Sequence, residues 1–247
     1  MKIELTRAGL FVRFVKLILS LVISSAQSQS TTYLAMEQSM MQYQHTYPEV
    51  SSMSSWIYGN RYLSMTEMTN NAWIVYYRLS AYGWTDEAIS AILANMQYES
   101  GINPGIWENL EPYAGGYGIV QWTPYTKYSA WAGTNWQNNG DRQCERIKYE
   151  LDNGLQWDKT GSYVPAQYKM DFADFVQSHE DVGYLAKVWL YCYEKPRNPA
   201  SKEQERDTAG RYWYSVITGE EPPEPPEPPQ PTGNVPIWLL FKFNEGR

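Results

Sequence analysis

The chain has 247 residues and a formal net charge of −7, so its length allows one large domain or one medium domain with appendages. With 43% hydrophobic and 15% aromatic residues it is too apolar to be a disordered chain. The acidic balance argues against nucleic acid as a partner. Only two His and two Cys are present, which excludes a zinc hydrolase with several His ligands in one core domain. If the chain is an enzyme, we therefore expect carboxylate chemistry with no metal and no cofactor.

The first segment, residues 1–55, is predicted to lie outside the core. Basic residues at positions 2, 7, 13 and 16 precede an apolar run over 17–23 and small residues at 24–26, a pattern typical of a signal peptide. An amphipathic helix that packs on a partner and a misassigned start are the alternatives. The run is too short and too interrupted by charge for a good membrane span. Residues 27–55 have the composition of a linker or docking segment.

The last segment divides into two parts. Residues 220–232 contain the sequence EEPPEPPEPPQP, which predicts a stiff polyproline II linker with repeated acidic charge. Residues 233–247 are rich in apolar side chains but are too few to fold alone. They are predicted to be an anchor peptide for a partner, with folding back on the domain as the alternative.

Between these ends, residues 56–219 predict a mainly helical domain. A capping box of Ser64 and Glu67 begins one helix, which we expect to end at Gly83, and the next runs from Thr85 to Gly101. Further helices are expected from about 123, over 141–153, from 178 to 193 and from 198 to 216. A Gly pair at 115–116 allows a small hairpin within 113–122. The expected fold class is therefore mainly α, a helical domain with a small hairpin and a Gly-rich loop.

Glu99 is the candidate proton donor. It follows Ile92 and Met96 at helical spacing, so it lies on the apolar stripe of its helix and in the last turn. Burial disfavours its anion, and the negative end of the helix dipole disfavours it again. Both effects raise the pKa toward the value that a general acid needs near neutral pH. The alternative is a solvated Glu at a frayed helix end.

A set of motifs gives the chain a family resemblance. An ES pair at a helix end is followed about twenty residues later by G-x-x-Q. The longer pattern consists of Asn71-Ala72, Gly83 to Thr85, Ala88-Ile89, Ile92 to Met96, Glu99 to Pro104, Gly116 to Thr123, Tyr193 to Pro196 and Arg206. The two motifs resemble those of the lysozyme-like superfamily of goose-type lysozymes and soluble lytic transglycosylases, and the longer pattern resembles the phage tail-tip lysozyme family over roughly residues 60–217. The resemblance implies a mainly α (α+β lysozyme-like) fold, with the small hairpin and Gly-rich loop beside the active-site cleft.

The resemblance implies a glycosidase that cleaves the β-1,4 bond between N-acetylmuramic acid and N-acetylglucosamine in peptidoglycan. Glu99 would protonate the leaving oxygen, and Ser100, Gly118 and Gln121 would line the cleft. Gly at 118 lets a bulky sugar approach the backbone. The second carboxylate stays open. Glu108 and Glu111 are the candidates in the loop, Glu194 matches a family position and is grouped with the substrate-binding residues, and each has a solvated loop carboxylate as its alternative. A lytic transglycosylase needs only one Glu, so hydrolysis is favoured by the family name alone.

Aromatic residues concentrate around the same loop. Sugar rings present C–H faces that stack on aromatic rings, so Trp107, Tyr117 and Trp122 are predicted to bind substrate. Core packing is the alternative for each of them.

The appendages predict a location. We expect a virion-associated enzyme at a phage tail tip, bound to other tail proteins through its N- and C-terminal segments and acting on peptidoglycan glycan strands for genome entry. An exported endolysin or a conjugation-associated lytic transglycosylase is one alternative, and an inactive wall-binding tail module is another. Cys144 and Cys192 are predicted to be buried free thiols, and a disulfide is the alternative if the chain is exported.

Overall fold

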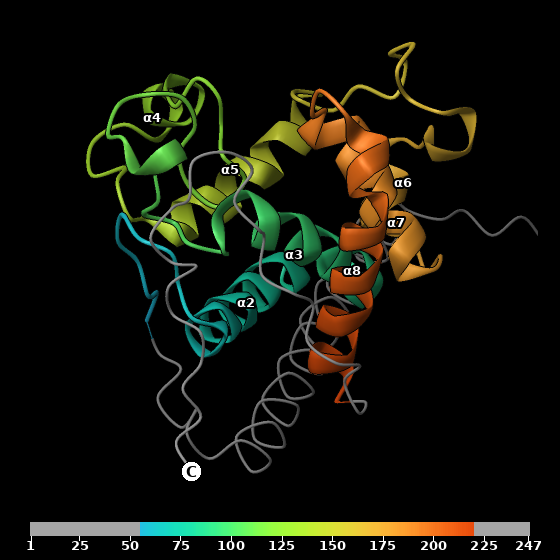
Figure 1. The fold of residues 1–247 in the computed structure, drawn as a ribbon, viewed down its shortest axis with the longest axis horizontal. Coiled ribbons are helices and arrows are strands. Elements are labelled where there is room, and N and C mark those ends of the chain that lie inside the picture. Colours follow the sequence, from blue (N-terminus) through green and yellow to red (C-terminus); the bar gives the residue numbers. More distant parts are fainter. Residues whose placement is uncertain (1–54, 220–247) are drawn as a thin grey trace, which may run out of the picture. The chain divides into compact units, whose positions relative to one another are not determined.

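The computed structural model describes residues 55–219, which form the mainly helical domain that the sequence predicts (Figure 1). The predicted N-terminal segment up to residue 54, the polyproline linker and the anchor peptide lie outside the described residues. The α-helices are α2 (Met65–Ser80), α3 (Asp86–Ser100), α4 (Thr126–Ala132), α5 (Gly140–Asp152), α6 (Phe172–Val176), α7 (Val182–Trp189) and α8 (Glu203–Thr218). Three short 3-10 turns (Glu108–Leu110, Ala166–Tyr168 and Pro199–Lys202) and one π-helical segment (Leu190–Glu194) complete the order.

Helix α3 lies at the centre of the domain and packs against α2, α6, α7 and α8 (Figure 1). Side chains on every face of it are buried between Ala88 and Gln97, which is the pattern of a core helix rather than a surface one. Thr85 caps its first turn by accepting a hydrogen bond from Ala88 N, and Gly101 ends it in the left-handed conformation. Both ends agree with the sequence prediction.

Helix α2 begins with the predicted capping box, in which Ser64 and Glu67 each accept a hydrogen bond from the other's backbone N–H. It ends at Ser80 rather than Gly83, because the chain turns through Ala81 to Gly83. On the buried side of α2, the Asn71 amide donates to Ile57 O at 2.7 Å and to Ile102 O at 2.9 Å. Asn71 thereby attaches the stretch before the helix to the body of the domain.

The helix predicted over 178–193 is two elements. Asp181 caps α7 by accepting from Tyr184 N, and after Trp189 the backbone widens into the π-helical segment. The N–H of Lys195 closes this segment on Leu190 O at 2.9 Å, five residues back, and Lys195 itself takes a left-handed conformation. The helix predicted from 198 begins as the 3-10 turn at Pro199 and becomes α8 only at Glu203.

The small hairpin is not formed within the described residues. Tyr117 instead makes two isolated antiparallel bridges, to Trp107 and to Trp122. The reversal falls at Gly118–Gln121, where Gln121 N donates to Gly118 O at 3.1 Å, and not at the Gly pair 115–116. A single pairing on each side of Tyr117 is too short to make a strand.

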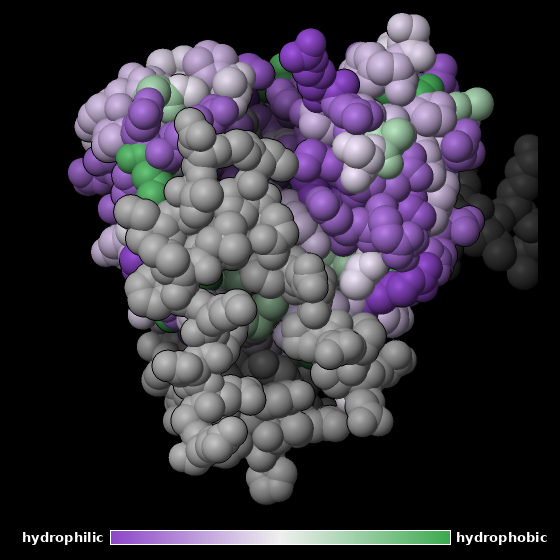
Figure 2. Space-filling model, viewed as in Figure 1, coloured by the Kyte–Doolittle hydropathy of each residue, from purple (hydrophilic) through white to green (hydrophobic). Residues whose placement is uncertain are grey.

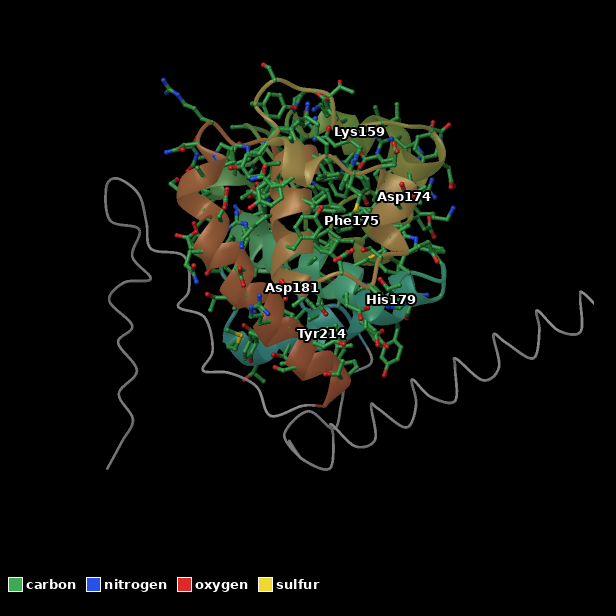
Figure 3. All side chains as sticks on the ribbon, turned by 90° about the vertical axis from the view of Figure 1, so that its right-hand side faces the viewer. Lys159, Asp174, Phe175, His179, Asp181 and Tyr214 are labelled. Carbon is green, nitrogen blue, oxygen red and sulfur yellow. The ribbon has the colours of Figure 1, made fainter. Side chains whose placement is uncertain are left out.

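The domain separates apolar and polar side chains clearly. On α6, Phe175 points into the interior and Asp174 lies at the surface (Figure 3). On the face that Figure 2 shows, hydrophilic residues gather over the part of the chain around α8. Arg211 on α8 pairs with Asp181 and with Asp207. Cys144 and Cys192 are both buried and free, as predicted. Among residues 55–219, no helix combines the length and apolarity needed to cross a membrane.

Candidate active site

Glu99 lies in the last turn of α3, where 25% of its side chain is exposed. Ser100, the next residue, connects this end of α3 to a neighbouring loop. The Ser100 side chain is buried, and its hydroxyl lies 2.8 Å from Ile119 O and 3.0 Å from Met96 O. Ser100 thus attaches the end of α3 to the turn that carries the G-x-x-Q motif, and the two predicted motifs lie side by side.

The turn at Gly118–Gln121 is closed by its own glutamine. The Gln121 amide donates to Gly118 O at 3.0 Å and to Ile106 O at 3.3 Å, and Gly118 N donates to Ile106 O at 3.0 Å. Gln121 therefore shapes the loop beside Glu99 with its amide nitrogen. Its side chain is half-buried, so part of it faces the surroundings of the turn.

Gln143 on α5 is a residue of this site that the sequence analysis missed. It is fully buried, its Oε1 accepts from Ile119 N at 2.8 Å and its Nε2 donates to Pro104 O at 2.8 Å. A Cβ on Gly118 would lie 2.5 Å from Gln143 Oε1, and Gly118 has φ +82°. The Gln143 amide is thus a close neighbour that requires glycine at this position, and the approach of a sugar ring to Gly118 stays a prediction.

Opposing influences act on the Glu99 carboxyl. Burial raises its pKa above the usual value, while the Arg206 guanidinium, with Nη2 at 3.1 Å from Oε1, and the Lys202 charge lower it, and Glu108 raises it further. Burial prevails, so the direction is upward, as the sequence predicts. A raised pKa on a partly exposed carboxyl is the property that we expect of a general acid near neutral pH.

Arg206 is the counter-charge of this carboxyl and comes from α8. Its side chain is 1% exposed, its Nε donates to Asn95 Oδ1 at 3.0 Å, and its guanidinium carbon lies 4.4 Å from the centre of the Tyr98 ring. Asn95 and Glu99 are one turn apart on α3, so one guanidinium joins α8 to the last two turns of the central helix. The motif match included Arg206 without indicating this contact.

The other predicted carboxylates lie at different places around Glu99. Glu108 is exposed in a 3-10 turn, where its Oε2 accepts from Gly116 N at 2.7 Å. Glu111 is exposed where that turn ends. Glu194 is half-buried at the end of the π-helical segment, and its Oε1 accepts from the Trp189 indole at 2.8 Å. Burial and then the Glu99 charge raise the pKa of Glu194 well above its usual value.

The predicted sugar-stacking aromatics are buried, which corrects that expectation. Trp107, Tyr117 and Trp122 are only 5%, 1% and 3% exposed. Trp107 and Tyr117 pack on each other with ring centres 4.6 Å apart, while Trp122 stacks on Tyr128. The exposed aromatic of this loop is Tyr113, at 63%. The aromatic residues mainly stabilise the loop by packing on one another. A ring face that is covered by a neighbouring ring cannot stack on a sugar.

Beneath the loop, Glu150 on α5 receives hydrogen bonds from three parts of the chain. Trp122 Nε1 lies 2.9 Å from its carboxylate, Arg146 Nε 3.0 Å and the Tyr193 hydroxyl 2.5 Å, and Glu150 is 1% exposed. Burial raises its pKa. Within residues 55–219, no three His, Cys, Asp or Glu side chains are placed to hold a metal ion.

The helical fold and a partly buried glutamate at a helix end beside a G-x-x-Q turn define a lysozyme-like domain. The family described as phage tail lysozyme matches residues 70–217, and the chain belongs to this family. Morphogenesis protein 1 of Bacillus phage B103 is 43% identical over 165 residues, which are 65% of this chain and 43% of that protein. The chain thus spans less than half of that relative's length.

Proposed function

We propose that the chain is a peptidoglycan-degrading glycosidase in which Glu99 is the general acid. The observation that carries this proposal is the state of Glu99 at the end of α3. Its carboxyl is partly exposed, its pKa is raised by burial, and Ser100 holds it beside the Gly118–Gln121 turn. The substrate is the β-1,4 bond between N-acetylmuramic acid and N-acetylglucosamine.

In the first step the Glu99 proton passes to the oxygen that links the two sugars, and the bond from that oxygen to the anomeric carbon breaks. The Arg206 guanidinium stabilises the carboxylate that remains, since it already lies within hydrogen-bond distance of Oε1. Of the two predicted loop carboxylates, Glu108 is the one whose charge raises the pKa of Glu99. We therefore favour Glu108 over Glu111 as the second carboxylate. Ser100, Gly118, Gln121 and Glu194 remain the predicted substrate-binding residues.

The test compares release of soluble muropeptides from purified sacculi by the wild type and by Glu99→Gln. The variant keeps the shape of the side chain without a transferable proton, so we expect a loss of about 10²-fold or more. Glu87→Gln is the matched control, since it makes the same change in the first turn of α3 and should retain activity. Equal release of muropeptides by Glu99→Gln and the wild type would overturn the assignment of Glu99 as the general acid.

The reaction products distinguish the two possible outcomes of bond cleavage. Hydrolysis leaves reducing ends, and we propose this outcome because the matched family is one of lysozymes. Transglycosylation closes the substrate's own 6-hydroxyl onto the anomeric carbon and leaves 1,6-anhydro ends. Mass spectrometry of the released muropeptides separates the two, and anhydro ends alone would contradict hydrolysis.

We further propose that the chain acts from the virion, at the tail tip, where local wall cleavage opens a path for the genome. The family's description as a tail lysozyme and the relative's name as a morphogenesis protein support this location. Mass spectrometry of purified particles tests it. An intact chain in the particle is expected, and a chain found only outside particles and cleaved after residue 26 would support export instead.

A further inference from the structure

Asn95 lies one turn before Glu99 on α3, and its fully buried amide connects three helices. Its Nδ2 donates to Ala186 O on α7 at 3.0 Å and to Ala91 O, one turn back on α3, at 2.9 Å. Its Oδ1 accepts from Arg206 Nε on α8 at 3.0 Å. Both N–H groups and the oxygen of the amide are therefore used.

These partners determine which way the Asn95 amide points. Carbonyl oxygens only accept hydrogen bonds and the Nε of Arg206 only donates, so the amide nitrogen has to face the two carbonyls and the amide oxygen has to face Arg206. Because a guanidinium is planar, a bond that fixes the Nε–H direction also restricts the two terminal nitrogens. The guanidinium carbon lies 4.4 Å from the centre of the Tyr98 ring, over its face. Asn95 and Tyr98 thus both hold the same cation.

The held guanidinium reaches the candidate acid through its other end. Nη2 of Arg206 lies 3.1 Å from Glu99 Oε1, and the Arg206 side chain is 1% exposed. A buried arginine without an acceptor at Nε keeps an unpaired charged donor, which costs free energy and favours rotation toward another acceptor. Asn95 satisfies this donor while Nη2 stays directed at Glu99. The position of the cation beside the carboxyl therefore depends on Asn95.

We propose that Asn95 is a positioning residue for the reaction, which fixes the Arg206 guanidinium so that its Nη2 faces the Glu99 carboxyl. The inference rests on the proposed function for its catalytic meaning. The bonds to α7 and α3 orient the amide, the amide orients Nε, and the guanidinium then stands beside Glu99 before and after the proton leaves. A cation that is already in place costs no reorganisation when the carboxylate forms.

The variant Asn95→Ser tests this positioning. The serine hydroxyl can donate to Ala91 O, as the Ser90 hydroxyl donates to the carbonyl one turn back on the same helix. Nε of Arg206 loses its acceptor, so the cation is held less well and the pKa of Glu99 rises. We expect the alkaline limb of the sacculus-cleavage pH profile to move up by about one pH unit.

Gln97 on the same helix offers a matched control. It is buried, and its Oε1 accepts from Trp213 Nε1 on α8 at 2.8 Å. Gln97→Met therefore removes a buried hydrogen bond between the same two helices, one that does not involve Arg206. Thermal melts should fall in both variants, whereas the alkaline limb should move in Asn95→Ser alone. An equal shift in both would show a general loosening of the helices and overturn the inference.

A second readout needs no substrate and shows whether Asn95 acts through Arg206. In full-length protein with glutamate labelled at the side-chain carboxyl carbon, the Glu99 signal is the one that Glu99→Gln removes, and its ¹³C titration gives the midpoint. We expect the midpoint to rise in Asn95→Ser, and to rise no further when Asn95→Ser is added to Arg206→Gln. An unchanged midpoint in folded Asn95→Ser, or an equal rise in both backgrounds, would overturn the inference.

Tyr98→Leu is a second variant, and it leaves the bond between Asn95 and Arg206 in place. Tyr98 is half-buried, and the change removes the ring over which the guanidinium lies. We expect a smaller rise of the Glu99 midpoint, again only when Arg206 is present. If Asn95→Ser does not fold, an unchanged midpoint in Tyr98→Leu overturns the inference.

Every one of these variants leaves the other charges around Glu99 in place. Lys202 lowers its pKa and Glu108 raises it, and the Glu99 charge in turn raises the pKa of Glu194. A shifted midpoint therefore reports on the Arg206 guanidinium. If the midpoints move as expected but the wild-type chain releases no muropeptides, the positioning stands and the proposed function is overturned instead.

Discussion

At the scale of single residues, opposing influences set the pKa of Glu99, the carboxyl that we propose as the general acid. Burial at the end of α3 raises its pKa, and the guanidinium of Arg206 at 3.1 Å limits the rise. Burial disfavours the charged form of the carboxyl, and the nearby cation stabilises the anion. The site therefore needs a central helix that is buried to its last turn and a second helix that supplies the charge.

This balance predicts the effect of Arg206→Gln on the pH profile. Losing the positive charge raises the pKa of Glu99 further, so we expect the alkaline limb of wall cleavage to move to higher pH. Arg206→Lys retains the charge and should stay closer to the wild type. The measurement is the activity profile of both variants, beside a thermal melt that shows each is folded. An equal shift of the alkaline limb in Arg206→Gln and Arg206→Lys would contradict the prediction, because the lysine retains the positive charge.

Gly118 carries a second prediction at this scale. In Gly118→Ala the new Cβ meets Gln143 Oε1 at 2.5 Å, and the Gln143 amide cannot move away without losing its bonds to Ile119 and Pro104. We expect a loss of about 3 kcal/mol in the free energy of unfolding, measured by urea titration. Gly154→Ala is the control, because it has φ +60° with no atom within 4 Å of a Cβ, and it should cost about 1–2 kcal/mol. Equal losses would mean that backbone conformation alone requires Gly118.

The site was only partly predictable from the sequence, and the reason differs by residue. The burial of Glu99 in the last turn of its helix could be predicted because it follows from the spacing of nearby apolar residues. Gln143 was not, since its partners Ile119 and Pro104 are 24 and 39 residues away and no spacing rule relates them. Trp107 and Trp122 were expected to bind sugar because aromatics gather around the loop, but composition does not reveal which ring faces are already covered.

At the scale of elements, helices with local signals were predicted and those without were not. Thr85 and Gly101 bound α3 as expected because caps act within a few residues. The π-helical segment at Leu190–Glu194 has no comparable signal, because its contacts are distant in sequence: Tyr193 bonds to Glu150 on α5, and Trp189 packs on Phe172 and Phe175 of α6. The predicted hairpin is absent from the described residues because Tyr117 forms only one isolated bridge to Trp107 and one to Trp122, too few to make strands.

The capping box of α2 yields a prediction of acid sensitivity. Hydrogen bonds from Arg61 hold the pKa of Glu67 at about 2, with help from Ser64. A carboxyl whose pKa is depressed in the folded state stabilises the fold above its ordinary pKa and loses this contribution as pH falls toward the folded value. Glu67→Gln should cost about 1 kcal/mol at neutral pH.

The pH dependence is what identifies this mechanism. The difference in unfolding free energy between the wild type and Glu67→Gln should narrow as pH falls from about 4.5 toward about 2, because both side chains are then neutral. Urea titrations at a series of pH values measure it. A difference that stays constant across this range would show that the carboxylate charge contributes nothing to the cap.

At the scale of the whole domain, the folded unit begins before the region that matches the family. The match starts at residue 70, yet Asn71 binds both backbone groups of Ile57, and the Asn103 amide donates to Gly59 O and Arg61 O at 2.8 and 2.7 Å. These bonds attach the stretch before α2 to the loop that follows α3. Folded structure therefore extends N-terminal to the family match, and the domain boundary at residue 56 stays a prediction.

Glu150 also connects distant parts of the domain, and the last prediction concerns its hydrogen bonds. Its carboxylate accepts from Trp122 in the loop, Arg146 on α5 and Tyr193 in the π-helical segment. Glu150→Ala leaves three buried or nearly buried donors without their acceptor. Since removing one partner of a buried ion pair leaves an uncompensated charge, we expect a loss of about 3–5 kcal/mol in the free energy of unfolding.

The control is Glu145→Ala on the same helix, where the pair of Glu145 with Arg142 is exposed and should be worth about 1 kcal/mol or less. Both changes place alanine in α5, so helix propensity affects them alike. Urea titration measures both, and activity of folded Glu150→Ala should also fall, because the loop beside Glu99 and the segment that carries Glu194 lose their common anchor. If Glu150→Ala cost no more than Glu145→Ala, the three parts would be held together by apolar packing alone.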